Sequence, residues 1–286
     1  MDESPVKQHR VMLRQVQEHL LAAHLLLGSL LESAGMVDVV HHPASPLPDL
    51  NYVTPRRSTA WVPGSYVERG LQRLRELGRA PVFQYLEGLL PAQFAETLAT
   101  TGLRPAPSRQ VVAYHTGGVG GEPARRSSAS LPDGVRIRPA QAARAARLWQ
   151  HACGVWTVQL PEAIPAMGDG SASTVSLVAT HNRQPAGLAR LDVRPEIGTA
   201  WLVALATNEQ TVGGLAKSLI GASLRSAVRR GCRLIFSFAE TPEAHALLEA
   251  SGLTPVARLA RFALPAADHE VNADDDCVAQ SVYTVN

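Results

Sequence analysis

Two stretches of the chain match each other, and this internal repeat constrains the fold more than any other feature. Residues 78–105 read GRAPVFQYLEGLLPAQFAETLATTGLRP, and residues 231–255 read GCRLIFSFAETPEAHALLEASGLTP. Each runs from a glycine through an apolar strand to a glutamate, Glu87 or Glu240, and then through a helical segment to Gly-Leu-x-Pro. Because repeats of this kind usually mark duplicated supersecondary units, we expect two copies of one fold.

Hydrophobic periodicity around the two copies predicts alternating strands and helices, and so an α/β chain with a mixed sheet in each of two lobes. In the first lobe, residues 1–115, we expect one helix or two over 6–34 ending at Gly35, helices over 64–77 and 92–101, and strands over 36–40, 50–53, 82–86 and 111–114. In the second, residues 134–264, we expect helices over 140–152, 162–168, 215–230 and 243–251, and strands over 135–138, 173–180, 185–193, 200–207, 233–238 and 256–264. The lobes are expected to share one topology and to pack as an internal pseudo-dimer.

Two segments lie outside this pattern. Residues 116–133 read TGGVGGEPARRSSASLPD, which is rich in Gly, Ser and Pro and has no apolar periodicity, as is typical of a linker between domains. A long active-site loop is the alternative interpretation of this segment. Residues 265–286 are polar and acidic, and we expect them to form a loose C-terminal tail.

Composition excludes several function classes. The formal net charge is only +2, so neither a nucleic acid nor a membrane is an expected partner. Cys153, Cys232 and Cys277 are too far apart for a zinc site or a disulfide framework, and the adjacent pair His41 and His42 rarely binds a metal alone, so no metal is expected. The N-terminus resembles no signal peptide, and the apolar run 20–31 is too short to span a bilayer, so we expect a cytoplasmic protein.

One segment predicts a ligand site. Residues 200–218 read AWLVALATNEQTVGGLAKS, in which an apolar strand runs into a turn with Gly213 and Gly214, and a long helix then begins. Glycines at this junction let backbone N–H groups approach a ligand, and the helix N-terminus adds a partial positive charge. The pattern therefore favours a pyrophosphate site, although a tight strand-to-helix turn alone would give the same local pattern.

This segment resembles the acyl-CoA site of the GNAT superfamily of N-acetyltransferases, in which a strand is followed by Gln/Arg-x-x-Gly-x-Gly/Ala. Residues 211–216, TVGGLA, match at Gly214 and Ala216, with Thr211 in place of Gln or Arg. The resemblance covers 134–264, and the whole chain is similar to a two-lobed subgroup with a degenerate first lobe, where WVPGS at 61–65 matches poorly. It implies acetyl-CoA as cosubstrate, bound through its pantetheine arm and phosphates by these residues: Leu205, Ala206, Thr207, Thr211, Val212, Gly213, Gly214, Leu215 and Ala216.

The chain departs from the family at its acid. The family often has a tyrosine that protonates the leaving thiolate, and Leu248 stands at that position; Thr241 stands where the family has an asparagine near the cosubstrate. Candidate bases are Glu240, Glu209 and His151, each of which could equally be an exposed structural residue. Trp149, Trp156 and Trp201 could line an acceptor pocket, although core packing is the expected role of Trp201.

The resemblance implies transfer of an acetyl group to a primary amine, with a small molecule as the expected acceptor. Two other functions stay open: a catalytically silent acyl-CoA-binding module, which the missing tyrosine favours, and acetylation of a peptide or protein amine. The expected state is a monomer with pseudo-dimeric lobes, or a homodimer.

Overall fold

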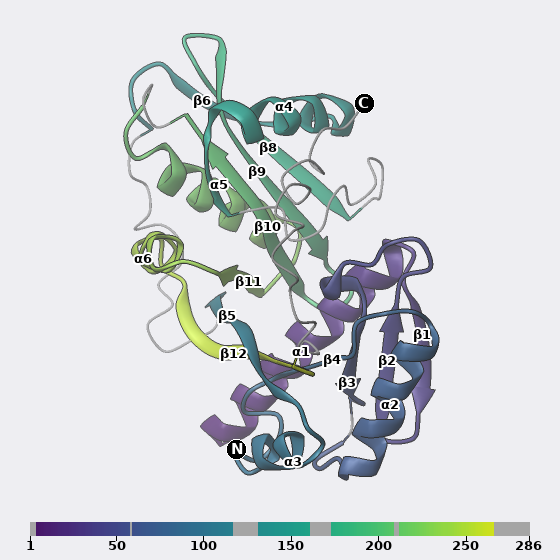
Figure 1. The fold of residues 1–286 in the computed structure, drawn as a ribbon. Helices are drawn as coiled ribbons and strands as arrows, with labels where there is room; N and C mark the ends of the chain where they lie inside the picture. The colour runs from purple at the N-terminus through teal and green to yellow at the C-terminus, as the bar shows by residue number, and fades with distance from the viewer. Residues whose placement is uncertain (1–3, 58, 117–130, 161–172, 209–211, 266–286) are drawn as a thin grey trace.

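The computed structural model describes residues 4–57, 59–116, 131–160, 173–208 and 212–265. These ranges form a mixed α/β fold in which helices cover both faces of one twisted sheet (Figure 1). The elements in chain order are α1 (Pro5–Leu26), β1 (Leu30–Ala34), β2 (Val37–His41), the short 3-10 helix η1 (Pro48–Leu50), β3 (Tyr52–Pro55), α2 (Gly64–Glu76), β4 (Val82–Leu86), α3 (Phe94–Thr100), β5 (Arg104–His115), β6 (Val135–Ala140), α4 (Ala142–Val155), β7 (Thr157–Leu160), β8 (Thr174–His181), β9 (Gln184–Arg194), β10 (Thr199–Thr207), α5 (Leu215–Arg229), β11 (Leu234–Ala239), α6 (Pro242–Ala250) and β12 (Thr254–Ala263).

The strands of both lobes join in a single sheet. Its order is β1-β2-β3-β4-β12-β5-β11-β10-β9-β8-β6, and β7 pairs with β10 off this path. The pairs β3–β4 and β10–β11 are parallel and the others are antiparallel, which confirms the predicted mixed α/β class. Across the described ranges, no helix combines the length and the apolar character needed to cross a membrane.

The last strand of each lobe lies between strands of the other lobe. β5 pairs with β11 and β12, and β12 pairs with β4 and β5. The β5–β12 register is symmetric: Arg258 faces Gln110 while Leu259 faces Arg109. The strand pairs on either side, β12–β4 and β5–β11, are equivalent in the same way: Leu259 faces Leu86, and Gln110 faces Ala239. The two lobes are thus related by an approximate twofold axis that passes between β5 and β12.

The repeat in the sequence corresponds to a repeated helix end. Gly102 after α3 and Gly252 after α6 have φ angles of +81° and +92°, a left-handed conformation that glycine adopts without strain. In both copies the N–H of the following leucine donates to a carbonyl five residues back, on Leu98 at 3.2 Å and on Leu248 at 3.1 Å. Leu98 and Leu248 are both fully buried. The predicted equivalence of these two leucines and two glycines therefore agrees with their positions in the fold.

Helix α1 ties the lobes together (Figure 1). Its apolar face packs in one cluster with Trp201, Phe236 and Phe238 of the second lobe. His19 of α1 is fully buried there, with Nδ1 2.7 Å from Thr199 Oγ1 and Nε2 3.3 Å from a carboxylate oxygen of Asp192. Burial lowers the pKa of His19, which favours the neutral form of the ring.

The N-terminal helix is shorter than predicted. Helix 6–34 was expected to end at Gly35, but α1 ends at Leu26 and residues 30–34 form β1, paired with β2. Gly28, with φ +93°, ends the helix, while Gly35 lies in the β1–β2 turn. Strand β7 was not predicted, and the helix expected over 162–168 lies outside the described residues.

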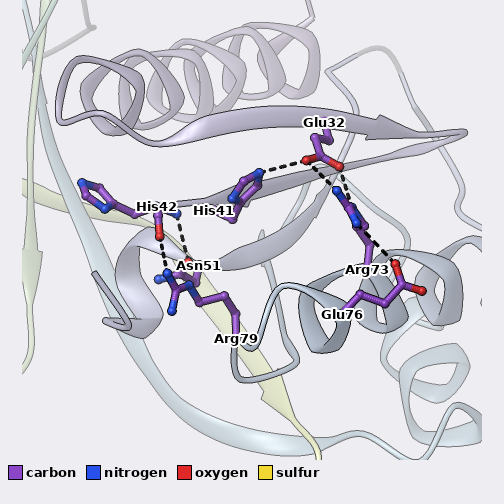
Figure 2. Close-up of polar contacts among 7 residues, drawn as sticks. All are labelled: Glu32, His41, His42, Asn51, Arg73, Glu76 and Arg79. Carbon is purple, nitrogen blue, oxygen red and sulfur yellow. Dashed lines mark hydrogen bonds and ion pairs between the residues drawn. The ribbon is translucent and has the colours of Figure 1, made fainter. Parts of the chain in front are cut away.

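His41 and His42 are held by separate polar contacts in the first lobe (Figure 2). His41 Nε2 lies 3.0 Å from the carboxylate of Glu32. The same carboxylate accepts a hydrogen bond from Arg73 Nε at 2.7 Å. His42 Nε2 donates instead to the carbonyl of Leu27 at 3.0 Å. The hydrogen bond from Arg73, and to a smaller extent the one from His41, holds the pKa of Glu32 below its usual range. Both histidines thus stabilise the β1–β2 region.

Candidate active site

The glycine turn lies between β10 and α5, as the sequence predicted. Gly214 is the N-cap of α5 with φ +72°, a conformation that side-chain-bearing residues rarely adopt. A Cβ atom built on Gly213 or Gly214 would meet no other atom within 4 Å, so the space in front of the turn is open. Val212, which is 8% exposed, anchors the turn in the core. The backbone is therefore accessible to a ligand here.

The first turn of α5 presents backbone amides rather than side chains. The N–H groups of Leu215, Ala216 and Lys217 are the first of the helix and have no acceptor within it. Leu215 and Ala216 are buried in the core beneath, and the first turn has no acidic residue. Lys217 is exposed and adds a positive charge. Amides, helix dipole and lysine together suit a phosphate group.

Among the described residues of the first lobe, no open glycine turn precedes the corresponding helix. That helix, α2, has Pro63 as N-cap, which has no N–H to donate. A Cβ atom on Gly64 would meet Thr101 Cγ2 at 3.3 Å, so the end of α3 covers this helix start.

Strands β10 and β11 diverge toward the glycine turn. Their parallel pairing covers only Thr199–Trp201 against Leu234–Phe236. One step further, Ser237 Oγ donates to the carbonyl of Leu202 at 2.9 Å, where backbone pairing has ended. A register shift in the β9–β10 pairing between Leu202 and Ala204 bends β10 at the same point. The divergence leaves an edge of β10 that β11 does not cover.

Strand β7 occupies that edge. Leu160, Val158 and Thr157 pair with Leu205, Ala206 and Thr207 respectively. The opposite edge of the same β10 residues pairs with β9. The three residues that the resemblance assigns to the pantetheine arm therefore have strands on both sides. Sequence reasoning missed β7 because TVQL is short and has no neighbouring turn signal.

Glu240 is ion-paired. Its carboxylate lies 2.7 Å from Arg109 Nε, and Arg109 also binds both oxygens of Asp49 at 3.0 Å. Its counterpart Glu87 lies 2.8 Å from Arg258 in the other half of the pseudo-twofold arrangement. Each glutamate thus pairs with an arginine on the exchanged strand of the other lobe. This pairing could not be found in the sequence, because Glu240 and Arg109 are brought together only by the strand exchange.

The two positions that depart from the family have structural roles. Leu248 is fully buried in the main core of the second lobe, where it provides no proton. Thr241 caps α6, and its Oγ1 accepts a hydrogen bond from the N–H of Ala244 at 3.2 Å. Its hydroxyl is therefore already engaged by the protein.

Of the remaining candidates, Trp149 and Trp156 pack in one cluster with Ala206 of β10. His151 is exposed on α4, with its ring centroid 6.2 Å from that of Trp156. Trp201 is 2% exposed and stacks on Phe236, which is the core role expected for it. Trp149 and Trp156 are also buried. Glu209 and Thr211 fall in the range 209–211, outside the described residues.

Comparison with known proteins places the fold. The chain matches a GCN5-related N-acetyltransferase from Kribbella flavida with a TM-score of 0.69 at 15% identity, covering 90% of this chain and 97% of the other. A tandem GNAT protein from the clavulanic acid biosynthesis pathway gives 0.56 at 12% identity, with 92% and 96% covered. A GCN5-related N-acetyltransferase from Sphaerobacter thermophilus gives 0.50 at 16%, with 81% of each chain covered. No family model and no curated protein matches the sequence. At these identities the likeness establishes the fold, which is that of tandem GNAT proteins.

Proposed function

We propose that the chain is an acetyl-CoA-dependent N-acetyltransferase that acts on a primary amine of a small molecule. The observation that carries the proposal is the open glycine turn at Gly213 and Gly214, which exposes the first amides of α5 on a fold shared with acetyltransferases. Retention of this turn in the second lobe, together with its absence from the first, favours one cosubstrate site per chain.

In this proposal the backbone amides at 213–216 bind the pyrophosphate together with Thr211 and Val212, which precede them in the sequence. The pantetheine arm follows β10 along Leu205, Ala206 and Thr207, which brings the thioester to the divergence of β10 and β11. The amine nitrogen then attacks the thioester carbonyl; a C–N bond forms, the C–S bond breaks, and the amine proton ends on the thiolate. Holding the two reactants together provides most of the rate enhancement.

The proton acceptor is proposed to be one of Glu240, Glu209 and His151. Glu240 lies at the C-terminal end of β11, near the divergence, and its carboxylate is ion-paired with Arg109 at 2.7 Å. A carboxylate at this position would also attract a cationic amine.

A catalytically silent acyl-CoA-binding module is the second candidate, favoured by the buried Leu248 at the position of the family's acid. Two measurements separate the candidates. Isothermal titration with acetyl-CoA should give a stoichiometry near one, and a panel of small amines should release free CoA thiol with at least one member. Binding without thiol release from small amines or peptides supports the silent module. Release only with peptides changes the acceptor class, and absence of binding refutes both candidates.

A further inference from the structure

The four residues of β7 lie at the place that the proposed cosubstrate needs. β10 has one edge on β9 and its other edge, beyond Trp201, on β7. In a strand paired on both sides, the N–H and C=O groups of alternating residues are bonded to one neighbour and then to the other. β7 therefore pairs along this edge with all three residues of Leu205–Thr207, with one irregularity between Leu205 and Ala206.

We infer that β7 (Thr157–Leu160) is an occluding strap, which acyl-CoA must displace before its pantetheine arm can pair with β10. This inference rests on the proposed function and concerns regulation of the same site. The strap imitates the arm, since both are extended chains with amide groups that can pair with the same strand edge.

Side chains hold the strap in place. Gln159 Nε2 donates to Thr207 Oγ1 at 2.5 Å, which ties the strap to the last residue of β10. Leu160 is 2% exposed and packs in the same core cluster as Leu205 and Leu248. Val158 packs against the α4 side of the sheet. Leu248, which stands at the position of the family's tyrosine, therefore lies in the same core cluster as Leu160 of the strap.

The strap is nevertheless short enough to leave. Only three of its residues pair with β10, and its start, Thr157, is exposed. Segments with few buried contacts open at low free-energy cost relative to the rest of a fold. A ligand that pairs with the same edge replaces the lost backbone hydrogen bonds, so the exchange of one extended chain for another is close to balanced.

The strap predicts a difference between two probes. The nucleotide 3′-phosphoadenosine 5′-diphosphate is CoA without its pantetheine arm, and it reaches the glycine turn without touching the strap. CoA must open the strap, so its apparent Kd is the intrinsic Kd divided by the fraction of molecules in which the strap is open. Loss of the Gln159 hydrogen bond in Gln159→Ala should therefore tighten CoA binding about fivefold. The Kd of the nucleotide should not change.

Calorimetry of both probes with four proteins tests this: the wild type, Gln159→Ala, Val158→Gly as a second way to weaken the strap, and Gln72→Ala as a control. Gln72 is an exposed glutamine of α2, and its side chain forms hydrogen bonds with Glu76 and Arg75 of the same helix. Tighter CoA binding in both strap variants, with an unchanged nucleotide Kd, supports the strap. Unchanged or weaker CoA binding in both, with normal nucleotide binding, overturns the strap and leaves the proposed function standing. If neither probe binds the wild type, the proposed function and the strap are both wrong.

Hydrogen exchange of the wild type gives an independent reading. On CoA binding, the amides of residues 157–160 should lose protection while those of 205–207 keep it. Retained protection in 157–160 in the CoA complex would overturn the strap, whatever the affinities.

Discussion

The substitution Gly214→Glu separates ligand binding from folding at the glycine turn. A carboxylate at this position enters the open space in front of the first amides of α5, where the proposal places the pyrophosphate. Two unit charges 4 Å apart repel by about 4 kcal/mol at an effective dielectric constant near 20. If the side chain rotates away and keeps half of this repulsion, about 2 kcal/mol, CoA affinity should still fall by about 30-fold.

The stability cost of the same change can be worked from the backbone. With φ at +72°, any side chain at 214 is strained by about 1–2 kcal/mol, while no steric clash is added. For a chain of this size such a loss lowers Tm by a few degrees. The variant should therefore be folded, which circular dichroism and thermal melting can establish before titration.

A matched control lies at the other end of the same helix. Gly231 has φ +87°, and a Cβ atom there also meets nothing within 4 Å. Gly231→Glu thus has the same charge and a similar backbone strain, away from the proposed phosphate site. Titration of CoA into both variants should give wild-type affinity for Gly231→Glu and a large loss for Gly214→Glu. Equal affinities in two folded variants would show that this turn is not the phosphate site.

Three further outcomes are expected. Glu240→Gln and Glu87→Gln should each lower the free energy of unfolding by at most about 1 kcal/mol in urea melts, because each loses a partly exposed ion pair between lobes; a rate loss above 100-fold in Glu240→Gln alone would assign it to the chemistry. Burial lowers the pKa of His24 to about 4, so protonation of this residue favours the unfolded state. The free energy of unfolding of the wild type should therefore fall by about 2 kcal/mol between pH 7 and pH 5. The fall should be smaller in His24→Gln. A fragment starting at Leu131 should be insoluble, because it lacks β4, β5 and α1; a soluble, folded fragment would contradict the shared sheet.

Elements of secondary structure that depend on local sequence pattern are predicted well. Apolar periodicity locates α2, β4 and α5 to within a residue or two, and the glycine turn before Leu215 is correctly placed. Prediction from periodicity fails where a turn signal is weak. Leu30 and Leu31 continue the helical pattern of α1, but Gly28 ends the helix and the two leucines pair with β2 as part of β1. The four residues of β7 are too few for a period to be recognised.

Pairing over long sequence distances is the part that local pattern does not contain. The glutamates of the repeat indicate a shared structural role, but they do not identify Arg109 or Arg258 as partners. Those partners follow from the exchange of β5 and β12, which depends on how two complete lobes pack. The same applies to the candidate site, where the turn is predicted but the strand that covers β10 is not.

The exchange of strands explains why a lobe without a ligand turn is retained. β11 provides one wall of the divergence at the candidate site, and its outer edge is paired with β5 from the first lobe rather than with a strand of its own lobe. β12 in turn lies between β4 and β5, so the second lobe cannot complete its sheet alone. Mutations that remove phosphate binding from the first lobe leave this sheet intact, whereas mutations that unfold β4 or β5 expose the edge of β11 beside the candidate site. Packing therefore constrains the first lobe, and in the proposed function ligand binding also constrains the second.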